Sequence, residues 1–510
     1  MANFLIGVDI GTQGTKSVLF DSDLNPVASS FVESNLISPQ PGTIWQEPDE
    51  LFSSVLQGVK QVMDQSGISP KEVAALGIDS QMAGIMGVDE TGEASMIYDS
   101  WLDTRCAPYA EQMAATAGES ITRITGGPVT YTHGPKILWW KEHYPQVYQR
   151  TCKFVLPHGY VVGKLCGLKG KDFVFDYTCL QYSGFGDNQN LVWSQELLDQ
   201  FHVDAEKMAR IVSPFEILGG IVPAWADQMG LLPGTPVVAG GGDTSCSIFG
   251  SGLFEPGTLL DCAGTASVLC CAVDRYVPDT ANQTMNMMRS PLEGLWYPLA
   301  YINGGGMDVS WFRKEFTGQP PMSYQELEAQ AEQLPCGSEG LIFAPHFNGR
   351  VLPSDPRMKG AFVGLDWKHT PAHLFRAVME GVGYEYAYYL QILRQLYPEA
   401  PFQEMTAIGG GAKSHLFLQL KADILGVNVI PLQVGDTAPV GSAVIAGTGV
   451  GLFQDPREPV AKTIQRRQAV SSNPEHHKAY KPYKEAYLQT LAALSALYRE
   501  QPLWNASPLE

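Results

Sequence analysis

One local pattern occurs twice in this chain and restricts its fold more than any other feature. Residues 4–20 contain two short apolar runs on either side of a glycine-containing turn, and residues 257–271 repeat the arrangement about half a chain later. Short apolar runs around such a turn are typical of β-hairpins. The repeat predicts two related halves that divide near residues 251–255, with one domain at 1–250 and another at 251–510.

The segments that follow each hairpin predict an α/β architecture. Residues 27–32 and 73–79 are predicted strands, and residues 48–67 between them are a predicted helix because their apolar side chains recur on one helical face. This order of elements predicts a mixed sheet covered by helices. The other elements predicted are strands at 235–239 and 405–408, helices at 136–143, 194–201, 323–334, 373–396, 416–425 and 439–449, and a peripheral helix within 471–510.

Composition argues against several classes of partner. The 510 residues are 45% hydrophobic, enough for two or three domains with full cores. A formal net charge of -19 argues against nucleic acid or an anionic membrane as a partner. No basic leader and no apolar run of transmembrane length is present, and the nine scattered cysteines include no Cys-x-x-Cys pair. These features predict a reduced, cytoplasmic protein without a zinc site or a disulfide framework.

The first turn, residues 9–16 (Asp-Ile-Gly-Thr-Gln-Gly-Thr-Lys), has the composition of a phosphate-binding loop. Its glycines allow a ligand to approach the backbone, and its hydroxyls and amine can bind phosphate oxygens. Asp9 at the strand end offers a carboxylate to the water shell of Mg²⁺. The Walker A spacing is absent, and from this motif alone an ordinary hairpin turn is the alternative.

Asp243 is the strongest single candidate for a catalytic residue. It follows three glycines, between a predicted strand and a predicted helix. An aspartate with an ordinary pKa of about 3.9 is ionised at neutral pH and can take a proton from a hydroxyl during phosphoryl transfer. A helix N-cap, which aspartate also favours, is the alternative.

Further polar or glycine-rich groups follow other predicted strands. Gly264-Thr265 is a second candidate phosphate turn, with a plain hairpin as the alternative, and residues 409–414 form a strand-to-helix turn whose amides can meet a nucleotide. In the segment 100–105, a tryptophan, an aspartate and an arginine suit a polyhydroxy ligand, and a surface ion pair is the alternative. Ser80-Gln81-Met82 comes directly after the strand at 73–79.

These motifs together resemble the FGGY family of carbohydrate kinases over nearly the whole chain. The most specific segment is Gly-Ala-Phe-Val-Gly-Leu at 360–365, followed by His-Leu at 373–374 and Ala-Val-Met-Glu at 377–380, which is similar to the C-terminal signature of the family. Lys-Ile-Leu-Trp at 136–139 resembles the other signature. His133 departs from it, since proline, serine or threonine is expected there.

The resemblance implies a fold, a reaction and a set of ligands. The fold would be two RNase H-like domains of the actin/hexokinase-like ATPase type around a central cleft, with ATP on one side and sugar on the other. Asp243 would be the catalytic base, and Asp9 with Asp243 would hold Mg²⁺ through waters. Family members are often homodimers. The residues implied in ATP binding are Gly11, Thr12, Gln13, Thr15, Lys16, Gly264, Thr265, Gly306, Gly410, Gly411, Ala412 and Ser414.

Within the family, the chain is most similar to the xylulokinases, which implies phosphorylation of D-xylulose to D-xylulose 5-phosphate. The residues implied in sugar binding are Gln81, Met82, Ala83, Trp101, Asp103, Arg105 and Asp243. Three residues of the implied sugar pocket depart from that pattern: Ser80 where glycine is expected, Ala83 where histidine is expected and Leu102 where asparagine is expected. The alternatives are a kinase for another ketose or polyol (ribulose, fuculose, rhamnulose, a pentitol or erythritol), a non-catalytic sugar or nucleotide sensor, and an actin-like assembly protein.

Overall fold

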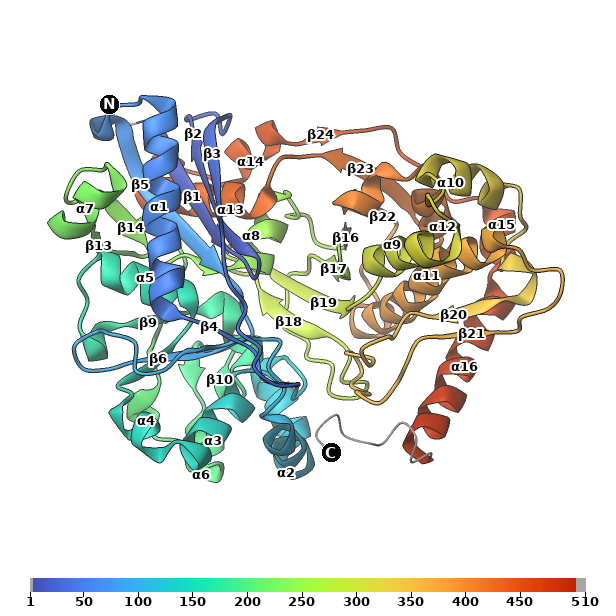
Figure 1. Ribbon diagram of the computed structural model, residues 1–510, viewed down its shortest axis with the longest axis horizontal. Helices are drawn as coiled ribbons and strands as arrows, with labels where there is room; N and C mark the ends of the chain where they lie inside the picture. Colours follow the sequence, from blue (N-terminus) through green and yellow to red (C-terminus); the bar gives the residue numbers. More distant parts are fainter. Residues whose placement is uncertain (1–2, 501–510) are drawn as a thin grey trace.

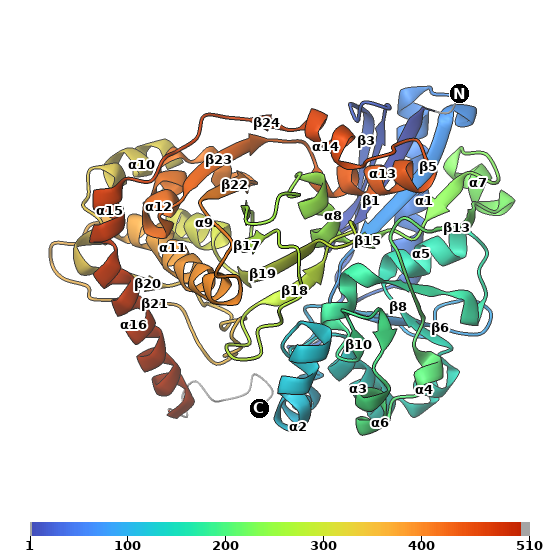
Figure 2. The ribbon, with the colours of Figure 1, turned by 180° about the vertical axis from the view of Figure 1, so that it is seen from behind.

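Two mixed sheets organise the computed structural model, which describes residues 3–500 (Figures 1 and 2). The N-terminal sheet has the order β13 (Ile217–Gly220), β14 (Pro236–Val238), β5 (Val73–Ser80), β1 (Phe4–Ile10), β2 (Gly14–Phe20) and β3 (Pro26–Glu33), with β15 (Gly241–Gly242) also paired to β5. The C-terminal sheet has the order β24 (Gln465–Arg466), β23 (Asn428–Gln433), β22 (Glu404–Ile408), β16 (Leu259–Ala263), β17 (Ser267–Cys271), β19 (Trp296–Ile302) and β18 (Asn286–Arg289).

The two sheets repeat one topology. In the N-terminal sheet β1 pairs antiparallel with β2 and parallel with β5, and in the C-terminal sheet β16 pairs antiparallel with β17 and parallel with β22. The next strands outward, β14 and β23, are again parallel to their neighbours, and β13 and β24 are antiparallel to them. The duplicated pattern predicted from the two hairpins is therefore confirmed as two sheets with the same strand order.

The predicted helices form close to their predicted bounds. Helix α1 (Pro48–Ser66) buries its apolar face and ends at Gly67, whose φ of 65° suits glycine. The other predicted helices are α3 (His133–His143), α6 (Gln195–Gln200), α10 (Tyr324–Glu332), α11 (Pro371–Leu396), α12 (His415–Leu425), α13 (Thr437–Gly449) and α16 (Lys481–Glu500). Residues 501–510 of the last prediction lie outside the described part. Helices α2 (Ala107–Thr125), α5 (Pro157–Leu165) and α9 (Gly306–Phe316) were not predicted.

Helix α13 links the two halves. It lies between β23 and β24 of the C-terminal sheet in sequence, yet it packs on β1 and β5 of the N-terminal sheet and beside α8 (Asp243–Gly250) (Figures 1 and 2). Glycines make this approach possible, since a Cβ on Gly7 would lie 2.0 Å from the carbonyl oxygen of Pro439 and a Cβ on Gly77 would lie 2.1 Å from that of Ser442. Helix α13 is therefore in close backbone contact with the N-terminal sheet.

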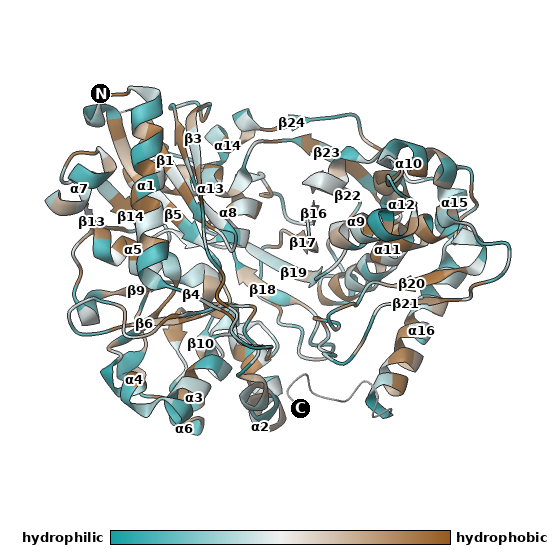
Figure 3. Cartoon of the chain, viewed as in Figure 1, coloured by the Kyte–Doolittle hydropathy of each residue, from teal (hydrophilic) through white to brown (hydrophobic). Residues whose placement is uncertain are grey.

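Apolar residues gather inside each half. Figure 3 shows them along β5 and β1, while α1 turns hydrophilic residues outward. A separate core surrounds α11 in the C-terminal half. All nine cysteines are free thiols, as predicted. Within residues 3–500, no helix is both long and apolar enough to cross a membrane.

Because α13 and α8 are in close contact, one methyl group added between them should have a large effect on stability. A Cβ on Gly441 would lie 2.1 Å from the carbonyl oxygen of Cys246, so Gly441→Ala must push the helices apart. We expect this substitution to lower the free energy of unfolding by about 1–3 kcal/mol, measured by denaturant titration. Gly118→Ala in α2 is the control, because its Cβ would meet only the Cβ of Ala114 at 3.9 Å. Equal unfolding midpoints for both variants would contradict the packing described here.

Candidate active site

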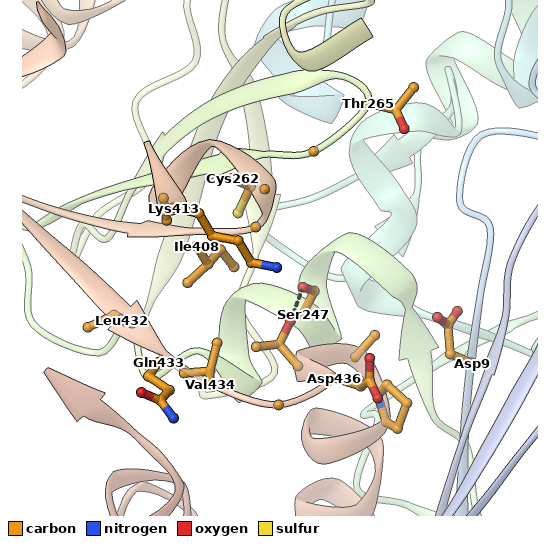
Figure 4. A pocket seen from close by; sticks show the side chains of 18 of the residues that line it. Asp9, Ser247, Cys262, Thr265, Ile408, Lys413, Leu432, Gln433, Val434 and Asp436 are labelled. Atoms are coloured by element: carbon orange, nitrogen blue, oxygen red, sulfur yellow. Dashed lines mark hydrogen bonds between the residues drawn. The ribbon is translucent and has the colours of Figure 1, made fainter. Parts of the chain in front are cut away.

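Two adjoining cavities share part of their lining, and the larger of them lies where the two halves meet. The larger, of about 740 Å³, is lined by Asp9 and Lys16 from the first hairpin and by the turn at 264–266, the turn after β22 and the loop at 432–439. Figure 4 shows that Asp9, Thr265, Lys413 and Asp436 reach it from different elements. Polar groups from both halves thus surround one space, as the binding of a polyphosphate requires.

The second cavity, of about 560 Å³, is more apolar. Its wall includes Tyr324, Phe375, Met379 and Phe417, from α10, α11 and α12. It shares Gly264, Thr265, Gly410 and Lys413 with the larger cavity. An apolar space next to a polar one has the chemistry that a nucleotide base and its phosphates need.

Most residues predicted to bind ATP line these cavities. Lys16, Gly264, Thr265, Gly410 and Ala412 line the larger one, and Gly306, Gly411 and Ser414 line the smaller. Gly11, Thr12 and Gln13 line neither. Thr15 is fully buried and its hydroxyl bonds that of Ser54 (2.6 Å), so any contact of Thr15 with a phosphate would be through its backbone.

The glycines of the C-terminal turns have two different roles. A Cβ on Gly306 would lie 2.0 Å from the carbonyl oxygen of Gly264, and one on Gly411 would lie 2.5 Å from the Cβ of Ala263, so both allow turns to pack on each other. A Cβ on Gly264 or Gly410 would meet nothing closer than 3.9 Å. The backbone at Gly264 and Gly410 is therefore open to a ligand in the cavity.

Three carboxylates converge at the tips of the N-terminal strands. Asp9 on β1 stands opposite Asp79 on β5, and Gly241 of β15 stands on the other side of Asp79. Asp243 follows as the first residue of α8. Parallel strands whose carboxyl ends meet at one sheet edge bring these side chains together, although they lie far apart in sequence.

The environment raises the pKa of all three carboxylic acids. Burial, and next the charge of Asp9, raise the pKa of Asp243 to about 7. Burial and the charge of Asp9 raise the pKa of Asp79 well above its ordinary value, and burial also raises that of Asp9. The ordinary pKa expected for Asp243 from the sequence is therefore wrong, because the spatial neighbour Asp9 and the loss of water were not visible in the local motif.

Asp79 is a residue of this cluster that the motifs did not reveal. It is fully buried, and its Oδ2 accepts a hydrogen bond from the Ser442 hydroxyl of α13 (2.5 Å). The raised pKa of Asp79 favours its neutral acid form beside Asp9. Its position at the end of a predicted strand parallel to β1 was the available signal.

Asp436 is the second residue that the motifs missed. It lies in the loop before α13 and pairs with Lys16 across the larger cavity, with 2.5 Å between Oδ2 and Nζ. Next to it, the hydroxyls of Thr437 and Ser247 bond each other (2.6 Å; dashed in Figure 4) and tie α13 to α8. The cation predicted for phosphate is thus already held at the cavity by an anion of the other half.

The residues predicted to bind sugar form two groups. In the first, Thr12 joins Gln81 and Trp101, since its hydroxyl donates to Oε1 of Gln81 (3.0 Å) and accepts from Nε1 of Trp101 (3.0 Å). Met82 packs against Gly242, where an added Cβ would lie 2.4 Å from the Met82 side chain. These residues lie between the first turn and Asp243, and Ala83 follows them, half-buried.

The second group, Asp103 and Arg105, is turned toward the protein. Nε of Arg105 donates to both oxygens of Asp103 (3.0 and 2.8 Å), and the Ile44 amide donates to Asp103 as well (2.7 Å). The guanidinium of Arg105 also lies 4.1 Å from the ring centre of Trp139. Asp103 is buried, so this is an interior ion pair rather than the surface pair considered as its alternative.

Comparisons with known proteins agree with this geometry. The N-terminal domain of the FGGY family of carbohydrate kinases matches residues 4–250, and its C-terminal domain matches residues 262–450. The xylulose kinase of Bacillus subtilis is 26% identical over 500 residues, which cover 97% of this chain and 98% of that protein. The gluconokinase of Bacillus licheniformis is 25% identical over 513 residues, which cover 98% of each chain. The ligand-bound crystal structure of xylulose kinase from Lactobacillus acidophilus has a TM-score of 0.90 at 24% identity and covers 98% of this chain and 99% of its own.

Proposed function

Since the chain belongs to the FGGY family of carbohydrate kinases and is a phosphotransferase acting on a sugar, we propose that its reaction is the ATP-dependent conversion of D-xylulose to D-xylulose 5-phosphate. The proposal rests on the position of Asp243, whose carboxylate is close enough to Asp9, a residue of the polar cavity, for the charge of Asp9 to raise its pKa. The full-length similarity to xylulose kinases supports D-xylulose as the acceptor.

Asp243 is oriented for the role of general base. The backbone amide and the hydroxyl of Thr244 both donate to its Oδ1, at 2.5 and 3.0 Å. Its Oδ2 is thus left to accept a hydrogen bond from the attacking sugar hydroxyl and then to take the proton. The raised pKa makes this carboxylate a stronger base than an ordinary aspartate.

The residues present fit ATP and Mg²⁺. Among residues 3–500, no group of three or more His, Cys, Asp or Glu side chains could hold a metal ion alone. Oδ1 of Asp9, however, is buried and has no protein partner, which suits a cation held largely by phosphates and waters. Asp9 and Asp243 would face that water shell, and bound Mg²⁺ would neutralise charge on the phosphate oxygens. The open backbone at Gly264 and Gly410 would hold the phosphates, and the apolar cavity the adenine.

The raised pKa of Asp243 predicts a pH dependence. Only its carboxylate form can accept a proton, so activity should be full above about pH 7 and fall about tenfold per pH unit below it. We expect kcat/KM for the sugar, measured at saturating ATP and Mg²⁺, to show this decrease toward low pH. A rate that stays constant down to about pH 5 would contradict the raised pKa or the role of Asp243 as base.

The three residues of the implied sugar pocket that differ from the xylulokinase pattern favour a different sugar as the phosphate acceptor. Ala83 offers no imidazole to a sugar hydroxyl, and a pocket that lacks a polar partner selects differently among polyols. Another ketose or polyol, such as ribulose, a 6-deoxyketose, a pentitol or erythritol, is therefore the alternative. A sensor that binds sugar without transfer has less support, because Asp9 and Asp243 are both present.

The proposal is tested by identifying the product. Protein, ATP, Mg²⁺ and D-xylulose are incubated, and phosphorus NMR measures sugar phosphate and inorganic phosphate. We expect one sugar monophosphate for each ADP formed. Inorganic phosphate as the main product would mean hydrolysis, and no turnover of D-xylulose, with turnover of another polyol, would move the assignment to the alternative.

A further inference from the structure

A buried ring of hydrogen bonds surrounds the backbone that carries Asp243. Ser80 Oγ lies 2.7 Å from Nδ1 of His158, and Nε2 of His158 lies 2.8 Å from Oδ2 of Asp176. The amide of Thr178 donates to Oδ1 of Asp176 (2.8 Å), and the Thr178 hydroxyl donates to the same oxygen. The amide of Gly242 donates to the Thr178 hydroxyl (2.9 Å).

The sheet closes this ring. Gly242 of β15 pairs with Ser80 of β5, so the first and last members stand opposite each other. The side chains come from separate elements: His158 from the first turn of α5, Asp176 from the end of β9 (Val174–Asp176) and Thr178 from the 3-10 helix η3 (Tyr177–Tyr182). Four segments of the N-terminal half are therefore joined at the residue that precedes Asp243.

The hydrogen-bonded order Ser80–His158–Asp176 resembles a Ser-His-Asp triad, but the burial of Ser80 excludes a nucleophilic role for its hydroxyl. Ser80, His158, Asp176 and Thr178 are each at most 2% exposed, and none lines either of the two cavities. Ser80 Oγ also accepts a hydrogen bond from the His158 amide (3.2 Å) and lies 3.2 Å from the Gln81 carbonyl oxygen. The hydroxyl is thus enclosed by protein and has no path to a substrate.

The backbone before Asp243 needs such support. Residues 240–242 are all glycine, and a run of three glycines has more conformational freedom than any other tripeptide. The ladder pairs only Gly241 and Gly242 with β5, at the end of that strand. The bond from the Gly242 amide to Thr178 is therefore a side-chain hydrogen bond that restrains the peptide between Gly241 and Gly242, directly before the residue that carries the base.

We propose that Ser80, His158, Asp176 and Thr178 are positioning residues that hold Gly242, and through it the carboxylate of Asp243, in the orientation for proton transfer. This rests on the proposed role of Asp243 as base. With His158 donating from Nε2 to Asp176 and accepting at Nδ1 from Ser80, every hydrogen bond of the ring has one donor and one acceptor. Serine at position 80, where the family resemblance leads one to expect glycine, is the partner that gives His158 its orientation.

Thr178→Val tests the ring, because valine keeps the shape of threonine and removes the hydroxyl. We expect kcat to fall about 100-fold, since a small displacement of a catalytic group has an effect of that size, while KM for ATP stays within about twofold. Thr178→Ser, which keeps the hydroxyl, should restore kcat to within about threefold of the unmodified protein. A loss of stability alone would not be rescued in this way at saturating substrate.

Thr151→Val is the matched control. Thr151 is equally buried, and its hydroxyl bonds that of Ser95 (2.7 Å) and the carbonyl oxygen of Val147 (2.9 Å), in a separate hydrogen-bond network. This variant should lose stability but keep kcat within about twofold. Equal kcat values for Thr178→Val and Thr151→Val would overturn the proposal.

A second substitution covers the case in which Thr178→Val does not fold. Ser80→Gly removes the hydroxyl from the other end of the ring and adds no volume, and we expect it to lower kcat at least about tenfold with KM for ATP unchanged. A Ser80→Gly protein with unmodified kcat would also overturn the proposal. If the unmodified protein phosphorylates no sugar, the proposed function fails first, so the two failures are distinguishable.

Discussion

Asp243→Asn is expected to lower kcat about 10³-fold while ATP still binds. Asparagine has the shape of aspartate, but its amide cannot accept a proton, and general-base catalysis contributes on the order of 10²–10⁴ to a rate. The residues that line the two cavities proposed for ATP do not include position 243, so the Kd for ATP should stay within about threefold. Single-turnover kinetics with sugar in excess would measure the chemical step, and calorimetry would measure ATP binding.

The control for this substitution is a second buried aspartate. Asp279 is fully buried and accepts hydrogen bonds from the amides of Asn282 (3.0 Å) and Thr284 (2.9 Å), but it lines neither cavity. Asp279→Asn should affect stability and leave kcat within about twofold. If Asp243→Asn retained a near-normal rate, Asp243 would not be the base, and another group would have to take the proton.

Asp9→Asn is expected to lower kcat about 100-fold at moderate Mg²⁺ and to raise the Mg²⁺ concentration needed for half-maximal rate. Oδ1 of Asp9 is buried without a protein partner beside the polar cavity, so its charge is available to the water shell of a bound cation. Loss of one preorganised charge near transferring phosphate has effects of about 10²–10³ on a rate. The rate as a function of free Mg²⁺ at fixed ATP measures both changes.

Asp23→Asn provides the comparison, because Asp23 is an exposed residue of the turn that follows β2 and pairs with the exposed Lys462. Its Mg²⁺ dependence should match that of the unmodified protein. A normal Mg²⁺ titration of Asp9→Asn would exclude Asp9 from the metal's surroundings, and the phosphates and Asp243 would then have to hold the ion without it.

The parts of the fold that the sequence predicts best are those with local signals. The apolar face of α1 repeats at helical spacing, and the two hairpins contain their turn glycines, so bounds were predicted to within a few residues. The crossing of α13 to the other sheet has no such signal. It depends on Gly7 and Gly77, whose missing side chains make room for a helix more than 350 residues away in sequence.

The candidate site divides in the same way, into residues with a local sequence signal and properties that depend on spatial neighbours. Gly264, Gly410 and Asp243 stand out in the sequence because glycines cluster around them, and the structure brings them to one region. The pKa of Asp243 depends on Asp9, a residue of another strand, and no local pattern reports it. Asp103 and Arg105 are the opposite case. Their sequence motif suits a sugar, but in the structure the two side chains largely bond each other.

The ring around Gly242 illustrates why spatial partners escape sequence analysis. The sequence marks Ser80 as a residue after a predicted strand and as a departure from an expected glycine, but it shows no motif for His158 or Asp176. Their relation becomes apparent only when β5, α5 and β9 are placed side by side. If Asp243 is the base as proposed, serine at position 80 would act through the support of that base and not through contact with the substrate.

The most direct test of this account is ADP release from ATP and Mg²⁺ against a panel of pentuloses, hexuloses, pentitols and glycerol. We expect strong stimulation by D-xylulose, with Ala83 tolerated in a pocket for that sugar. Strong stimulation by another polyol alone would mean that Ser80, Ala83 and Leu102 have changed the acceptor. ATP turnover that no member of the panel stimulates would contradict the account and favour a protein that uses ATP as a conformational switch.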